Sequence, residues 1–283
     1  MSIPLLAGDA YRYLATLQGW AWMGLLTLLG GGVLAPLTRL VAPLWPGARL
    51  HFADTVHTML ALYQRSVLYM RVEVEGERQP PGSRVLVANH QSWLDPLVLM
   101  GIEARLHGPV RRYMLEVPIF GSIVRQCGFF PGEVGELPSF EAIDASVAEA
   151  RAGGGSLLFF PEGTRGEDGA IGRFHRGAFR VAADHALPVQ PVVIEGLHRV
   201  LPRRGPIVQA PGRSLVRVRY LEPSPPPADA GPGPERRAAV REWAARVRER
   251  MVAELETMRA EDGAETVGTA AGWGLASRGG RPR

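Results

Sequence analysis

The sequence contains a single cysteine, Cys127, and no lysine. One thiol cannot form an internal disulfide or a cysteine-based metal cluster, and a reducing, cytoplasmic-facing compartment is the simplest inference. All basic residues are therefore arginines, and the formal net charge is +4. This mild excess suits anionic partners such as phosphates or acidic lipids, but it lacks the dense basic stripe of a nucleic-acid binder, so we expect no nucleic acid as a partner.

Length and composition exclude several architectures. Of the 283 residues, 46% are hydrophobic and 21% are charged, which is typical of globular proteins and excludes collagen-like, coiled-coil and wholly disordered chains. The length allows one large domain or two small ones. The histidines show none of the spacings typical of zinc sites, so we expect no metal.

The chain begins with an unusually apolar segment. Residues 13–38 carry no charged side chain, and a membrane-spanning helix needs about 20 apolar residues. Three glycines at 30–32 and Pro36 interrupt the segment, so a re-entrant or interfacial helix and a buried core hairpin stay open as alternatives. Because Arg39 and Arg49 follow it, the positive-inside rule places the rest of the chain in the cytoplasm. We therefore expect membrane association at the cytoplasmic face of the inner (plasma) membrane.

The middle of the chain alternates short apolar runs with helical patterns. This predicts an α/β fold with a mixed, largely buried sheet flanked by helices, after an N-terminal two-helix membrane-associated motif. The second of those helices, at 52–70, could instead be ordinary core packing. Strands are expected at 84–88, 112–115, 156–160, 189–194 and 215–221, and helices at 96–102, 119–126, 140–151 and 177–185.

Five segments follow from these patterns. They are the membrane motif (1–70), the α/β domain (71–222), a Pro-rich linker (223–234), a basic amphipathic helix (235–262) and a disordered tail (263–283). The C-terminal helix either docks on the domain or lies on anionic lipid, and we favour docking.

The most informative local pattern is NHQSWLD at 89–95, between an expected strand and an expected helix. Strand ends that lead into helices commonly carry the sites of α/β proteins. If the chain turns here, the carboxylate of Asp95 can accept the Nδ1 proton of His90 and leave Nε2 free as a general base. The pair Asp95-Pro96 is also a good helix start, and a lone histidine at a strand end is commonly structural. Both interpretations remain open on this pattern alone.

Two further segments carry cationic groups. FFPEGTR at 159–165 follows another expected strand, and its Arg165 offers a forked set of donors that matches a phosphate. Glu162 could orient Arg165 or accept a substrate hydroxyl, although an exposed turn with an ion pair is the simpler account. FHRGAF at 174–179 opens a helix and adds Arg176, or it serves only to start that helix.

In their order and residue sequence these segments resemble those of the lysophospholipid acyltransferases of the 1-acylglycerol-3-phosphate acyltransferase type. NHQSWLD matches that family's H-x4-D block, FFPEGTR its phosphate-binding block and FHRGAF its F-x-x-G segment. Residues 187–196 resemble its fourth block, in which Pro191 lines the acyl-donor side. The resemblance covers 84–196, and the two-helix front also agrees with the family.

One departure affects the acceptor. The family's second block ends in an arginine after an apolar strand, whereas this chain has Pro131-Gly132-Glu133 at that place. Arg125 lies earlier in the sequence and could compensate. Otherwise the acceptor carries something other than a bare glycerol phosphate.

The resemblance implies acyl transfer to a lysophospholipid without a cofactor. The donor would be acyl-CoA or acyl-carrier protein, the acceptor 1-acylglycerol-3-phosphate, and the reaction would take place at a membrane surface. The implied catalytic residues are His90 and Asp95, and the implied substrate-binding residues are Glu162, Gly163, Thr164, Arg165, Arg176 and Pro191.

Other functions remain open. The acceptor could be another lysolipid, such as a lyso-ornithine lipid or a lysophospholipid with a head group. The same two catalytic residues could serve a hydrolase or a CoA-independent transacylase. A non-catalytic membrane-binding scaffold is a third hypothesis, and the intact His90, Asp95, Glu162 and Arg165 argue against it.

Overall fold

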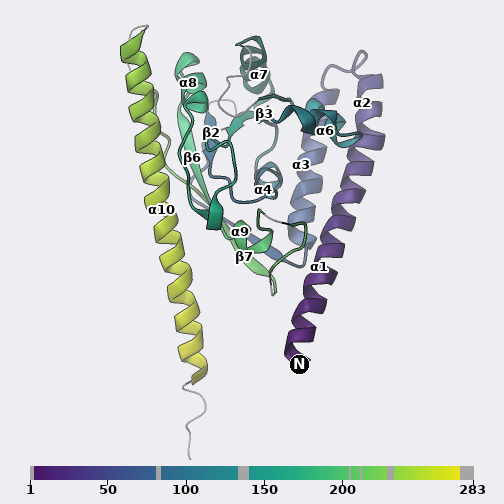
Figure 1. Cartoon of the computed structure of the whole chain (residues 1–283). Helices are drawn as coiled ribbons and strands as arrows, with labels where there is room; N and C mark the ends of the chain where they lie inside the picture. Colours follow the sequence, from purple (N-terminus) through teal and green to yellow (C-terminus); the bar gives the residue numbers. More distant parts are fainter. Residues whose placement is uncertain are drawn as a thin grey trace, which may run out of the picture.

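The computed structural model describes residues 3–80, 84–132, 140–203, 205–210, 212–227 and 233–274. Within these residues, seven strands form one sheet in the order β1-β7-β6-β2-β5-β3-β4, and every neighbouring pair is parallel except β6 and β7. The expected mixed α/β sheet is therefore confirmed (Figure 1). The strands are β1 (Met70–Glu75), β2 (Val85–Ala88), β3 (Leu106–Val110), β4 (Phe129–Pro131), β5 (Ser156–Phe159), β6 (Val189–Glu195) and β7 (Ser214–Tyr220).

Helices cover both faces of this sheet (Figure 1). In chain order they are α1 (Ile3–Thr27), a π-helical segment (Leu28–Leu34), α2 (Ala35–Val41), α3 (Ala48–Ser66), α4 (Asp95–Ile102), α5 (Arg112–Glu116), α6 (Phe120–Gln126), α7 (Phe140–Gly153), a 3-10 turn (Glu167–Gly169), α8 (Gly177–Asp184), α9 (Leu197–Val200) and α10 (Pro234–Gly274).

Alternating side chains of the central strands divide the core into two layers. In β2, Leu86 and Ala88 pack with α1, α3 and α4, whereas Val85 and Val87 pack with α7, α8 and α10. Successive side chains of a strand point to opposite faces, so a strand covered on both sides is apolar throughout. All four residues of β2 and all seven of β6 are buried, which confirms the expected buried sheet.

The helices α3 and α10 are both core helices on their apolar faces. Phe52, Val56 and Leu60 of α3 belong to one layer of the core, as the core-packing alternative predicts. Trp243 and Met251 of α10 are buried in the other layer, so this helix docks on the domain. Its polar face, with several arginines, remains in solvent, and its helical span reaches Gly274.

The N-terminal helices stay continuous through the three glycines. The sequence suggests that the glycines interrupt the helix. Residues 30–32 instead lie in the π-helical segment, so the helix continues through them. A Cβ on Gly31 would come within 2.3 Å of the Ile119 carbonyl oxygen, so glycine permits this close approach. Ser122 also donates to the Gly31 carbonyl at 3.1 Å. These contacts fix the N-terminal helices against α6.

The same helices expose a large apolar surface. Over Gly8–Val41 the helix is long and apolar enough to cross a membrane. Among the described residues, twelve of nineteen exposed large apolar side chains lie between positions 13 and 45, and Leu44 is 89% exposed. An exposed patch of this extent marks a site for a membrane or a partner.

Three segments differ from their expected form. Residues 112–115, expected as a strand, belong to α5, because four apolar-rich residues do not distinguish a strand from a helical turn. The start of the expected linker pairs with the sheet, since Ser224 and Val189 exchange two backbone hydrogen bonds of 2.7 and 2.9 Å; positions 228–232 lie outside the described residues. The expected tail is helical as far as Gly274, and 275–283 lie outside the described residues.

Candidate active site

Asn89, which precedes His90, joins the ends of two neighbouring strands. The Asn89 side chain donates to the Ile194 carbonyl at 2.9 Å and accepts from the Ile194 amide at 2.7 Å, which joins the ends of β2 and β6. Because both groups are buried, this pair of bonds is stable against competition from water. The loop that follows therefore starts from a rigid frame.

His90 and Asp95 form the pair that the spacing predicts. His90 Nδ1 lies 2.6 Å from Asp95 Oδ2, and Asp95 is completely buried at the start of α4. The same oxygen accepts the backbone amides of Gln91 at 2.5 Å and Ser92 at 2.8 Å. An ionised carboxylate accepts and cannot donate, so Nδ1 carries the proton and Nε2 is left with a free lone pair.

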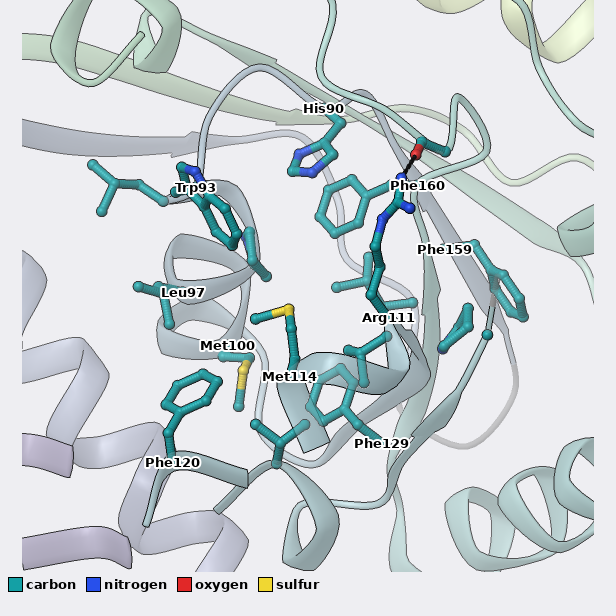
Figure 2. A pocket seen from close by; sticks show the side chains of 18 of the residues that line it. His90, Trp93, Leu97, Met100, Arg111, Met114, Phe120, Phe129, Phe159 and Phe160 are labelled. Carbon is teal, nitrogen blue, oxygen red and sulfur yellow. Dashed lines mark hydrogen bonds between the residues drawn. The ribbon is translucent and has the colours of Figure 1, made fainter. Parts of the chain in front are cut away.

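The imidazole also has a fixed orientation. Its ring stacks on Phe160, with the centroids 4.5 Å apart and an interplanar angle of 29°. The His90 side chain remains 21% exposed and lines a cavity (Figure 2). A base with one nitrogen anchored and the other facing a cavity is suited to removing a proton from a bound hydroxyl.

Glu162 connects the His90 loop to a second loop. Its Oε1 accepts the His90 amide at 2.9 Å, and its Oε2 accepts the Gly172 amide at 2.7 Å. Burial raises the pKa of Glu162, and the two amide donors oppose this shift. With one backbone donor on each oxygen, Glu162 holds two loops together and does not orient Arg165, which was one expectation from the sequence.

Arg165 lies close to the His90 loop. Its guanidinium carbon is 4.8 Å from the ring centroid of Trp93, and its Nη1 donates to the Arg203 carbonyl at 3.4 Å. Trp93 and Arg203 both line the cavity, so Arg165 sits at its edge. Gly163, at φ +66°, turns the chain there and lines the cavity, whereas the Thr164 side chain is exposed.

Arg111 is a cationic residue that the sequence analysis misses. It follows β3, lines the cavity and donates from Nη2 to the Gly163 carbonyl at 3.3 Å (Figure 2). Arg125, which the sequence suggests as a replacement for the absent second-block arginine, donates instead to the Leu115 carbonyl and does not line the cavity. The signal for Arg111 is its place just after a strand, but the run LHGPV contains Gly and Pro and is hard to identify as one.

The cavity is large and mostly apolar, with a volume of about 1510 Å³. On one side of His90 it reaches between the N-terminal helices and α6 (Figure 2). Side chains from five helices and β4 line this apolar arm, among them Met23, Leu26, Met59, Met100, Met114, Phe120, Ile123 and Phe129. Helix α1 therefore forms part of the cavity wall.

Two expected substrate-binding residues lie in different surroundings. Arg176 lines the cavity just before α8. Pro191 is a buried residue in the middle of β6, paired in register with Val87, and it is not one of the described residues that line the cavity. Within the described chain, no group of three or more His, Cys, Asp or Glu residues could hold a metal ion.

Comparisons with known proteins agree with this geometry. Residues 71–195 match the family model described as Acyltransferase. The 1-acyl-sn-glycerol-3-phosphate acyltransferase LPAT1, chloroplastic, of Arabidopsis thaliana is 30% identical over 155 residues, which are 54% of this chain and 42% of that protein. A 1-acyl-sn-glycerol-3-phosphate acyltransferase of Pseudomonas aeruginosa is 30% identical over 162 residues, 55% of this chain and 62% of that protein. The matched regions thus span about half the length of these relatives.

A solved structure has the same fold. The crystal structure of the 1-acyl-sn-glycerophosphate (LPA) acyltransferase PlsC from Thermotoga maritima superposes with a TM-score of 0.67 and 21% sequence identity. The superposition covers 88% of this chain and 98% of that one, so the likeness extends over most of the fold.

Proposed function

Because residues 71–195 match the Acyltransferase family model, we propose that this protein transfers a fatty acyl group from a thioester to the free hydroxyl of a lysophospholipid. The observation that carries the proposal is the His90–Asp95 pair, 2.6 Å apart, at the junction of an apolar cavity and a set of arginines. 1-Acylglycerol-3-phosphate is the proposed acceptor, since it is the substrate named for the relatives from Arabidopsis thaliana and Pseudomonas aeruginosa.

The proposed reaction needs one base and no cofactor. His90 Nε2 accepts the proton of the acceptor hydroxyl, whose oxygen forms a bond to the thioester carbonyl carbon. The carbon–sulfur bond then breaks, and the departing thiolate takes the proton back from the imidazolium. The products are an ester and a free thiol. Buried Asp95 stabilises the imidazolium between these steps.

Arg165 and Arg111 are the proposed ligands of the acceptor phosphate. They approach the same turn, because Arg111 donates to Gly163 and Arg165 follows that glycine by two residues. Two guanidinium groups at one turn provide paired donors for phosphate oxygens. Arg111 would thus supply the charge that the missing second-block arginine supplies elsewhere in the family. Holding both reactants beside the base can lower the barrier by about 7–11 kcal/mol.

Membrane association follows from the apolar surface. Trp93, Tyr113 and Val117 are exposed and also line the cavity, so the cavity opens beside apolar side chains. We propose that the N-terminal helices lie in the cytoplasmic face of the membrane, where a lysophospholipid can enter laterally and a thioester can enter from the cytosol.

The test is acylation of 1-acylglycerol-3-phosphate by purified protein and its His90→Ala variant. We expect ester formation by the wild type and none by the variant, with an unchanged melting temperature. His175→Ala is the matched control, because His175 is an exposed imidazole that lines the same cavity. Turnover by His90→Ala would refute the mechanism.

A panel of lysolipids identifies the acceptor. Acylation of a lyso-ornithine lipid or a head-group-bearing lysophospholipid, without acylation of 1-acylglycerol-3-phosphate, would overturn the proposed acceptor. Activity that persists without thioester would point to a hydrolase or transacylase.

A further inference from the structure

The cavity has a second arm, which is cationic. From the catalytic pair it continues along α8 to the start of α10, and it is lined there by Arg176, Arg180, Arg236 and Arg237, which we call the arginine groove. This arm is distinct from the Arg111 and Arg165 turn, because its arginines come from α8, the residue before it and α10.

The arginine groove has an excess of positive charge. Asp184 is the one acidic residue among the described residues that line the cavity. Asp184 lies 3.5 Å from Arg180 and 2.9 Å from Arg236. Within the described part of the chain, neither Arg176 nor Arg237 takes part in an ion pair, and the Arg237 side chain is exposed. Clustered guanidinium groups repel one another, so this arrangement favours a bound polyanion.

The groove starts beside the catalytic loops. His175 donates its amide to the Pro161 carbonyl at 2.7 Å, which places Arg176 next to the turn that contains Glu162. From there α8 extends over eight residues, about 12 Å at 1.5 Å per residue, to Asp184 and its partner Arg236. The charges are therefore spread over a distance along the groove, and its inner end adjoins the reacting centre.

Uncharged side chains accompany these arginines in the cavity lining. Ala178 of α8, Val240 of α10 and Phe159 of β5 all line the same cavity. A ligand that runs along this arm from His90 would thus meet both apolar side chains and guanidinium groups. Coenzyme A offers both kinds of partner, since an uncharged pantetheine arm joins its thioester to a diphosphate and a 3′-phosphate.

We infer that the arginine groove binds the nucleotide phosphates of an acyl-CoA donor, an assignment that rests on the proposed acyl transfer. The apolar arm then holds acyl chains, and the groove holds the carrier. Guanidinium groups suit this task, because each can donate two parallel hydrogen bonds to a phosphate. The site lies along a cavity, and this shape favours a small polyphosphate over the broad face of a carrier protein.

The test uses two donors that differ only in the nucleotide. Palmitoyl-CoA carries the phosphates, whereas palmitoyl-pantetheine has the same thioester without them. For the double variant Arg236→Ala with Arg237→Ala we expect KM for palmitoyl-CoA to rise at least tenfold, with KM for palmitoyl-pantetheine and kcat for both donors unchanged. Arg246→Ala is the matched control, because Arg246 is an exposed arginine of α10 that does not line the cavity. It should change neither KM.

Binding is measured separately from turnover. Isothermal titration of the wild-type protein with adenosine 3′,5′-bisphosphate should show one site, weakened at least tenfold in the double variant and unchanged in Arg246→Ala. If no thioester is turned over but this binding pattern holds, the proposed function fails and the site stands. If both donors are turned over with unaltered KM values in the double variant, the site is refuted and the proposed function stands.

Two other occupants would also overturn the inference. A loss confined to acyl-carrier protein as donor would assign the groove to a protein carrier. Weaker binding of the double variant to anionic phospholipid vesicles, with equal loss for both thioesters, would assign it to the bilayer surface.

Discussion

Replacing Asp95 with asparagine removes the negative charge of the carboxylate but keeps the size and shape of the side chain. Asp95 Oδ2 accepts two backbone amides, from Gln91 and Ser92, besides the imidazole of His90. An amide oxygen at the position of Oδ2 can accept hydrogen bonds from these three donors. An amide nitrogen at that position could not accept them. The side chain of the variant should therefore keep its oxygen in this position, with the proton still on His90 Nδ1.

The expected effect on catalysis is about a thousandfold. The variant loses the negative charge that stabilises the imidazolium formed when His90 takes the proton. At a charge separation of about 4 Å and an effective dielectric constant of about 20, that attraction is worth about 4 kcal/mol. Each 1.36 kcal/mol corresponds to about a factor of ten in rate, so kcat should fall about 10³-fold.

The variant should also be less stable. Its amide nitrogen would take the place of Asp95 Oδ1, a buried atom with no hydrogen-bond partner among the described residues. A buried donor without a partner costs about 1–3 kcal/mol, which should lower the melting temperature by several degrees.

Steady-state kinetics and thermal unfolding of Asp95→Asn test both expectations. Asp54→Asn is the control, because Asp54 pairs with Arg105 at 2.6 Å on α3, away from the cavity lining. It should lower stability without changing kcat. A kcat for Asp95→Asn within tenfold of the wild type would refute the electrostatic role of this carboxylate.

Three further outcomes follow from groups near or outside the cavity. Glu162→Gln should lower the free energy of unfolding by about 1–3 kcal/mol, measured by denaturant titration, because an amide cannot accept a backbone donor at both of its polar atoms; an unchanged value would contradict the loop-joining role. Burial raises the pKa of the Cys127 thiol to about 12, so iodoacetamide at pH 8 should label the unfolded chain but not the native protein. Two arginines of β7 hold the pKa of Glu75 below its usual value of 4.5, so its carboxylate stabilises the fold above that value, and the stabilisation is lost as the pH falls through the lowered pKa. The stability difference between wild type and Glu75→Gln should accordingly shrink on acidification below about pH 4.5, and a constant difference would contradict the pairing.

The two motif-bearing strands and the His90–Asp95 pair can be predicted from the sequence, whereas several residues around them cannot. The strands of the NHQSWLD and FFPEGTR segments are predictable because each is an unbroken apolar run, typical of a strand buried on both faces. The meeting of His90 with Asp95 is predictable from their place between a strand and a helix. Arg111 and Pro191 are not, because their positions depend on how distant strands pair, and local patterns carry little information about that.

Boundaries that depend on tertiary packing are also hard to predict. The run at 112–115 is short enough to fit the apolar periodicity of either a helix or a strand. Its helical form is fixed by packing against α6 and β4. Likewise, three glycines normally suggest a break, yet the close contact of Gly31 with Ile119 keeps a helix there.

The position of α1 in the cavity wall limits how the protein can be redesigned. Gly19, Met23 and Leu26 of α1 face the space that would receive an acyl chain, so this helix does more than attach the protein to a membrane. An unrelated transmembrane anchor joined to residue 46 could attach the protein to a bilayer. The apolar arm of the cavity would then lack the wall that α1 forms. Solubility engineering of this protein should therefore alter only the outward-facing leucines of the helix, such as Leu14, Leu17 and Leu25, and keep its inward-facing side intact.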